Sequence, residues 1–102
     1  MVLGDRFGTA CATALTDTAE RALRGLGFSV ARNVPYAGGF TTHHYGRPAE
    51  GLHALQIEIN RDLYMDEERI ERRPGLAALK ARIDRLMQAL AAIEPKELGA
   101  IA

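Results

Sequence analysis

The feature that most constrains the fold is a stretch of alternating polar and apolar residues at positions 53–63. A period of two places successive side chains on opposite faces of a β-strand. One face carries Leu55, Ile57 and Ile59, and the other carries Gln56, Glu58 and Asn60. The polar face has two interpretations: it meets water, as in many antiparallel sheets, or it lines a cleft into which Glu58 points. The polar face carries amide and carboxylate groups and not the Lys, Thr and Arg that are usual on solvated strands. This composition supports the cleft interpretation, but both interpretations stay open.

The segments on either side of this region predict two amphipathic helices. Residues 10–27 place apolar and charged side chains on opposite faces, with Thr9 or Thr16 as the expected N-cap and Gly27 as the expected C-terminal cap. A second helix, opened by Pro74, is predicted from apolar residues spaced by three and four. These residues are Leu76, Leu79, Ile83, Leu86, Leu90 and Ile93. The stripe favours packing on a sheet or a helix over a dimeric coiled coil, because two heptads are short for a coiled coil.

Residues 28–32 predict a short strand after the first helix, because aromatic and branched residues alternate there. A helix, a glycine turn and a strand form half of an α/β repeat, so the predicted fold class is α/β. Near the start of the chain, the sequence G-D-R-F-G at residues 4–8 predicts a tight turn. In that turn either Asp5 and Arg6 serve a site, or the segment is a polar loop with Phe7 turned inward.

Residues 33–51 predict a long loop. Gly38 and Gly39 allow a sharp turn or a close approach to a ligand, and the sequence that follows them, F-T-T-H-H-Y-G-R-P, is rich in polar aromatic side chains. Loops held between regular elements are where binding sites are built. This loop is therefore the expected place for a site.

The three histidines of the chain, His43, His44 and His53, are candidate metal ligands. Adjacent histidines on a loop usually point in different directions, and His53 is about 16 Å from Glu58 on an extended strand. No complete metal site follows from this spacing, so hydrogen-bonding roles are expected for the histidines. Glu58 suits the role of a general base and acid better than that of a ligand.

Residues 65–73, M-D-E-E-R-I-E-R-R, predict a solvated helical turn or short helix with Asp66 as its N-cap. The alternative is a contact with an anion or a nucleic acid through Arg69, Arg72 and Arg73. Four acidic residues in this stretch of nine disfavour that alternative. Residues 94–102 are predicted to form a C-terminal tail.

Composition limits the classes of function. A chain of 102 residues predicts a single domain, and its thirteen basic and thirteen acidic side chains cancel, which argues against nonspecific nucleic-acid binding. The sequence contains no apolar run of about 18 residues, so no membrane span is predicted. The first residues lack the pattern of a signal peptide, and a cytoplasmic location is therefore expected. Cys11, the single cysteine, allows no internal disulfide and is expected to be a small buried side chain.

Two runs of sequence resemble the C-terminal part of N-formylglutamate amidohydrolases. They are V-L-G-D-R-F-G-T-A-C and, further along, N-V-P-Y-A-G-G-F-T-T-H-H-Y-G-R-P followed by G-L-H-A-L-Q-I-E-I-N-R-D-L-Y-M-D-E. The resemblance covers nearly the whole chain. It implies a fold similar to that of zinc carboxypeptidases and aspartoacylases, a three-layer α/β/α phosphorylase/hydrolase fold, of which this chain would hold a few strands and two main helices. It also implies zinc-dependent hydrolysis of N-formyl-L-glutamate to glutamate and formate, a step of histidine degradation.

The same resemblance implies roles for five residues. Glu58 matches the carboxylate that polarises the zinc-bound water, and it is the predicted catalytic residue. Arg6, His44 and Arg61 match polar positions of the family motifs, and we expect them to hold the carboxylates of the substrate as charge-assisted donors. Tyr36, beside the glycine pair, is expected to form a wall of the substrate site. No residue of this chain is predicted to be a metal ligand.

The chain also departs from the family pattern, because family members are usually much longer. The resemblance places most zinc ligands in an N-terminal part, including an Asp-x-His segment that would precede the first residues of this chain. We therefore expect a single, incomplete domain over residues 1–102, with a small N-acyl amino acid as its ligand and with zinc not fully bound by this chain alone. The alternative is a catalytically inactive, truncated domain that binds a partner or forms a homo-oligomer through the 76–93 helix or the 53–63 strand.

Overall fold

A three-stranded sheet lies at the centre of the structure, a computed structural model that describes residues 1–66, 68–69, 71–72 and 75–99. Strand β1 (Val2–Gly4) is in the middle, parallel to β2 (Ala31–Arg32) and antiparallel to β3 (Gln56–Glu58). Val2 lies opposite Ala31 on one side and Glu58 on the other. The middle strand was not predicted, since three residues are too few to show a period of two.

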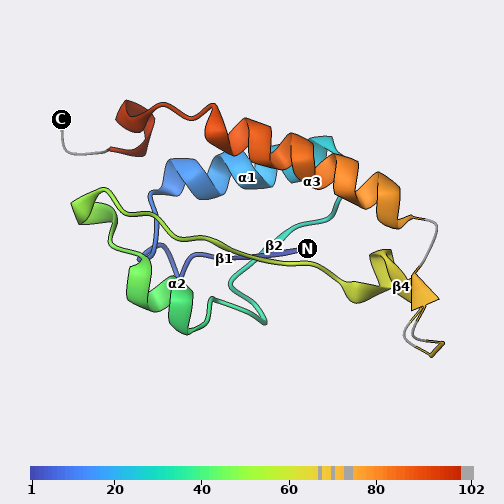
Figure 1. Cartoon of the computed structure of the whole chain (residues 1–102). Helices are drawn as coiled ribbons and strands as arrows, with labels where there is room; N and C mark the ends of the chain where they lie inside the picture. Colours follow the sequence, from blue (N-terminus) through green and yellow to red (C-terminus); the bar gives the residue numbers. More distant parts are fainter. Residues whose placement is uncertain (67, 70, 73–74, 100–102) are drawn as a thin grey trace.

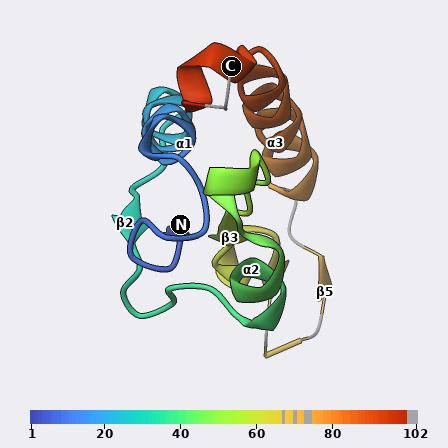
Figure 2. The same ribbon diagram turned by 90° about the vertical axis from the view of Figure 1, so that its left-hand side faces the viewer.

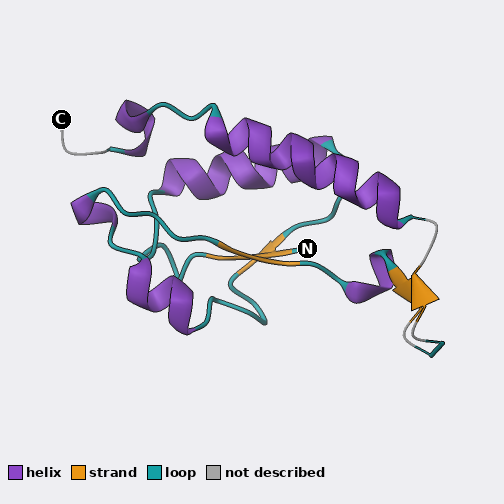
Figure 3. Ribbon diagram, in the orientation of Figure 1, coloured by secondary structure: helices purple, strands orange, loops and turns teal. Residues whose placement is uncertain are grey.

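Helices cover the two faces of this sheet unequally. The long helices α1 (Thr13–Gly25) and α3 (Leu76–Ala91) pack together on one face (Figure 1). The short helix α2 (Phe40–Tyr45) and the loop before it lie on the opposite face (Figure 2). Figure 3 colours the helices and strands of the chain. Three 3-10 turns and a small hairpin complete the described elements. These are η1 (Pro48–Glu50), η2 (Arg61–Leu63), η3 (Pro95–Leu98), and the paired strands β4 (Met65–Asp66) and β5 (Glu71–Arg72). The predicted α/β class, with a small sheet and two main helices, is confirmed.

The hydrophobic core lies between the sheet and the two long helices. Its buried members come from β1, α1, the segment after α1, and α3. They are Leu3, Ala19, Leu23, Phe28, Leu79 and Leu86. The apolar face predicted for residues 53–63 packs against this cluster, as do Ile83 and Leu90 of the predicted stripe. Both amphipathic patterns therefore face the same core, which explains why each element has one apolar side.

Helix α1 ends as predicted and begins differently. Gly27 has a φ of 94°, which favours glycine, and the amides of Gly27 and Phe28 donate to the carbonyls of Arg24 and Leu23. This is the Schellman pattern of a helix C-terminus. The predicted N-caps were wrong: Ala12 occupies the N-cap position without a side-chain cap, and Thr16 is buried inside the helix.

Three other predictions need correction. The strand predicted at 28–32 is confined to β2, because only those two residues pair with β1. The predicted loop at 33–51 contains α2 and η1, which are too short to produce a detectable period. The helical turn predicted at 65–73 is a hairpin, in which Asp66 Oδ1 accepts the amides of Glu68 and Arg69 in the turn. Arg73, which belongs to the last of these predictions, and Pro74, which was predicted to open the second long helix, lie outside the described residues.

The described helices include none with the length and apolar character that crossing a membrane requires.

The packing of α3 gives a stability prediction. Leu86 is fully buried, whereas its neighbour Met87 is 48% exposed. We expect Leu86→Ala to lower the free energy of unfolding by about 2–5 kcal/mol, because it removes transfer energy and leaves a cavity. Met87→Ala is the matched control and should change it by less than about 0.5 kcal/mol. Urea unfolding followed by circular dichroism measures both, and equal losses would contradict the placement of α3.

Candidate functional site

The site is organised around Glu58, which β3 presents on its polar face. Glu58, Tyr36 and Arg61 line one cavity of about 460 Å³, together with Met1, Val2, Ile59 and Asn60. Cavities of roughly this size hold small-molecule ligands. The structure therefore supports the cleft interpretation of the polar face. It brings together three of the five predicted site residues: Glu58 and Arg61, which are close in the sequence, and Tyr36, which is distant from both.

Gln56 connects Glu58 to α2 and to the loop before it. Its Nε2 donates to Glu58 Oε1 at 3.0 Å, and its Oε1 accepts the Gly39 amide at 2.8 Å and the Thr42 hydroxyl at 3.5 Å. Because the two donors fix the amide oxygen, the amide nitrogen is directed toward the Glu58 carboxylate. The alternation had placed Gln56 and Glu58 on one face. The contact with Gly39, 17 residues away, carried no sequence signal.

Arg6 and His44 do not line this cavity. Arg6 Nη1 donates to the Gly38 carbonyl at 3.2 Å, and its backbone amide donates to the Ala37 carbonyl at 2.8 Å. The His44 ring stacks on Phe40 at 5.1 Å and meets the edge of Tyr45 at 4.7 Å between centroids. Their roles in binding substrate remain predictions.

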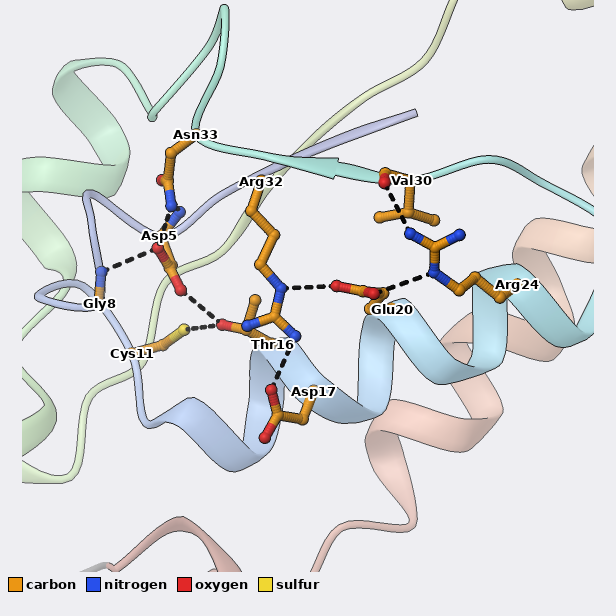
Figure 4. Close-up of polar contacts among 10 residues, drawn as sticks. All are labelled: Asp5, Gly8, Cys11, Thr16, Asp17, Glu20, Arg24, Val30, Arg32 and Asn33. Atoms are coloured by element: carbon orange, nitrogen blue, oxygen red, sulfur yellow. Dashed lines mark hydrogen bonds and ion pairs between the residues drawn. The ribbon is translucent and has the colours of Figure 1, made fainter.

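A hydrogen-bonded hub at Asp5 holds the turn that carries Arg6, as Figure 4 shows. Asp5 Oδ1 accepts the Gly8 amide and the Asn33 side-chain amide, both at 2.9 Å, and Oδ2 accepts the Thr16 hydroxyl at 2.9 Å. Asn33 Oδ1 in turn accepts the backbone amides of Asp5 at 3.1 Å and Phe7 at 3.2 Å. The sequence left open whether Asp5 serves a site or belongs to a polar turn, and it gave no sign that Asp5 bonds to Asn33, because the two are 28 positions apart.

This hub holds three residues in a strained backbone conformation. Arg6 and Phe7 have φ values of 54° and 57°, and Asn33 has a φ of 63°, all in the left-handed region. Such residues cost on the order of 1–3 kcal/mol each and persist only where the surroundings hold them. Phe7 points outward and is 72% exposed, so the expectation that it turns inward was wrong. Glycine is needed at position 4, since a Cβ there would lie 2.7 Å from the carbonyl carbon of Ala37.

Burial and hydrogen bonding at the hub shift two pKa values. Burial by itself would raise the pKa of the Asp5 carboxyl, but hydrogen bonds from Asn33, Gly8 and Thr16 outweigh burial, and the pKa lies below its ordinary value. Cys11 is buried, as predicted, and burial raises the pKa of its thiol. Its Sγ lies 3.2 Å from the Thr16 hydroxyl, which already donates to Asp5. A protonated Cys11 thiol therefore completes the chain of hydrogen bonds to the carboxylate.

An ion-pair cluster next to the hub joins α1 to β2 (Figure 4). Arg32 contacts Glu20 at 2.6 Å and Asp17 at 2.7 Å, and Arg24 contacts Glu20 at 2.9 Å. Hydrogen bonds from Arg32 and then Arg24 lower the pKa of Glu20. The cluster ties the helix to the edge strand, on the side of the sheet away from Glu58.

His53 takes a hydrogen-bonding role, as expected from the sequence. Its Nδ1 accepts the Ala12 amide at 2.9 Å at the start of α1, while its Nε2 is buried with no hydrogen-bond partner in the described part of the chain. Across the described residues, no three His, Cys, Asp or Glu side chains are grouped so that they could hold a metal ion. The described residues thus do not form the zinc site that the resemblance implies.

The architecture and the cavity define a class: a mixed α/β unit with a small mixed sheet, two main helices and a carboxylate at a cleft beside the sheet. The chain belongs to the N-formylglutamate amidohydrolase family, whose model matches residues 1–65. It is 37% identical over 93 residues to an N-formylglutamate deformylase of Pseudomonas aeruginosa and 34% identical to one of Pseudomonas putida. The match covers 88% of this chain and 35% of each relative, so the chain spans about a third of their length.

A solved structure shows the same fold. The crystal structure of N-formylglutamate amidohydrolase from Ralstonia eutropha JMP134 superposes with a TM-score of 0.78 at 45% sequence identity. The match covers 96% of this chain and 34% of that chain. The predicted family is therefore confirmed, and the chain corresponds to part of the family fold.

The Asp5 hub gives a prediction about pH. A folded-state pKa below the unfolded value means that the stability from Asp5 is present above the unfolded pKa, near 4, and is lost as pH falls through the folded pKa. Asp5→Asn should lower the free energy of unfolding at pH 7 by about 1–3 kcal/mol. It should also reduce the further loss that wild type shows on acidification to pH 3.

Urea unfolding at the two pH values checks this expectation. Asp84→Asn, which removes an exposed carboxylate on α3, is the control and should leave the pH dependence close to wild type. A pH dependence unchanged by Asp5→Asn would show that the hub does not favour the ionised carboxylate.

Proposed function

We propose that this chain supplies the acid–base carboxylate and part of the substrate cleft for hydrolysis of the formamide bond of N-formyl-L-glutamate. The observation that carries the proposal is the meeting of Glu58, Tyr36 and Arg61 at one cavity in a chain of this family. The relatives that the chain matches are named N-formylglutamate deformylases. Because the chain spans about a third of their length, the complete activity would need the rest of the fold.

The cavity supports specific roles for its residues. The Glu58 carboxylate accepts a proton from the attacking water as the water oxygen bonds to the formyl carbon, and it returns that proton to the nitrogen as the C–N bond breaks. Formate and the free amine of glutamate are the products. The Arg61 guanidinium, exposed at the rim of the cavity, donates hydrogen bonds to a substrate carboxylate. The Tyr36 side chain forms part of the cavity wall and so limits the size of the substrate. No step is assigned to a metal, because the described residues hold no group of metal ligands.

A chimera tests this proposal. The part of the Pseudomonas aeruginosa deformylase that matches this chain is replaced by the chain itself, and formate release from N-formyl-L-glutamate is measured. We expect release by the chimera and a fall in kcat of roughly 10²–10⁴-fold in its Glu58→Gln variant, because the proton carrier is lost while the side-chain shape is kept.

The matched control is Glu50→Gln, which changes an exposed carboxylate of η1. It should leave kcat within about twofold of the unsubstituted chimera, because surface changes away from a site have small effects. A chimera that folds but releases no formate would count against the proposed function. Release that survives Glu58→Gln would remove Glu58 from its role.

Gln56 gives a further prediction in the same chimera. Gln56→Leu removes the donor to Glu58 and the acceptor of the Gly39 amide. A carboxylate without its orienting partner is misplaced for proton transfer, so kcat should fall by about tenfold or more. Steady-state kinetics measures kcat and KM, and thermal unfolding of the same samples checks that the chimera stays folded. An unchanged kcat would show that Glu58 does not depend on Gln56.

A further inference from the structure

The chain exposes more surface than a compact protein of its mass. Its accessible surface is 6788 Å², against about 5,700 Å² expected for a folded monomer of this mass. Its radius of gyration is 14.6 Å, against about 13 Å for a compact domain of this length. The excess area, about 1,100 Å², is comparable with the roughly 800 Å² that each partner buries in a standard interface.

The exposed apolar side chains are gathered on one part of the chain. Of the eight large apolar residues that are exposed in the described part, six belong to residues 5–9 and 33–52. The most exposed are Phe40 at 75% and Phe7 at 72%, and Tyr45 is 60% exposed. Residues 33–52 contain α2, which lies on the face of the sheet opposite the long helices (Figure 2).

Contacts join these segments into one surface. The Asp5–Thr9 turn bonds to Ala37 and Gly38 through Arg6, and Gly39 bonds to β3 through Gln56. His44 contacts both Phe40 and Tyr45 along α2. We call the surface formed by Phe7, Tyr36, Phe40 and Tyr45 the aromatic face. Apolar patches of this kind on a folded protein mark sites of interaction.

We propose that the aromatic face is the contact surface for the remaining two thirds of an N-formylglutamate amidohydrolase fold. The chain keeps the conformation of the Ralstonia eutropha relative over 96% of its own length while covering 34% of that chain. A part that keeps its family conformation also keeps the surfaces against which the rest of the fold packs. Most of the apolar stripe of α3 is instead used in the chain's own core, through Leu79, Ile83, Leu86 and Leu90. This inference rests on family membership and not on the proposed activity.

Co-expression tests the proposal with the full chain. The tagged chain is produced together with the Pseudomonas aeruginosa deformylase from which the matching third has been removed. The position of the cut is chosen with a positive control: the deformylase's own matching third, produced as a separate chain, must reassociate with the remainder. We expect this chain to co-purify with the remainder in a one-to-one complex. We expect the double variant Phe40→Asp and Tyr45→Asp to reduce the co-purified amount at least tenfold.

Controls separate the aromatic face from general effects. Met87→Asp, which places the same charge on an exposed apolar position of α3, should leave co-purification within twofold of wild type. Phe7→Asp, on a different segment, should act like the α2 double variant if the face is continuous. Circular dichroism of the isolated variants confirms that each remains folded.

Three results would overturn the proposal. The first is failure of this chain to co-purify where the deformylase's own third does. The second is co-purification that is insensitive to the aromatic-face variants. The third is a stable dimer of the isolated chain, measured by light scattering, that the same variants dissociate, since the occupant of the face would then be a second copy. Because the readout is complex formation, an inactive complex would contradict the proposed function and leave this inference standing.

Discussion

Hydrogen bonds of the Asp5 carboxylate and the Asn33 side-chain amide hold together the ends of β1 and β2. Asp5 directly follows the middle strand and Asn33 directly follows β2, so their hydrogen bonds close the parallel pair at its carboxyl end. The same groups hold Arg6 and Phe7 in left-handed backbone conformations. The amide and carboxylate are nearly fully satisfied, which is the condition under which a buried polar network makes a fold more specific. Thr16 extends the network into α1, so one carboxylate connects the sheet, the turn and the helix.

The candidate site depends on this arrangement because the loop after Asn33 is placed by it. The backbone of Arg6 binds Ala37, and the close approach of Gly4 to the same residue leaves no room for a side chain. The loop then reaches β3, where the Gly39 amide holds Gln56 and Gln56 holds Glu58. A catalytic carboxylate is effective only when its orientation is fixed. The route from the Asp5 hub to Glu58 is therefore a continuous series of backbone and side-chain contacts.

The two faces of the sheet are covered unequally. A fold of three layers buries both faces of its sheet, whereas this chain covers one face with long helices and the other with a single short one. The apolar side chains left on the second face accompany a cleft lined by the Glu58 carboxylate and the Arg61 guanidinium. Among the described residues, no three His, Cys, Asp or Glu side chains are grouped so that they could hold a metal ion. Both features agree with a chain that spans about a third of its relatives.

The sequence by itself determined the features that depend on local period and on motif. The apolar face of residues 55–59, the stripe from Leu79 to Leu90 and Gly27 after α1 appear as predicted, because each is a pattern within one element. The strand predicted at 53–63 is confined to residues 56–58, and residues 61–63 form a 3-10 turn in its place. Only the tertiary structure decided which residues meet across 17 or more positions: Val2–Gly4 as the middle strand between β2 and β3, Asp5 with Asn33, and Gln56 with Gly39. Such pairs are set by packing and by the satisfaction of buried polar groups, and neither leaves a period in the sequence. The hairpin at 65–72 was missed for the same reason, since strand pairing outweighed the charged, helix-favouring composition.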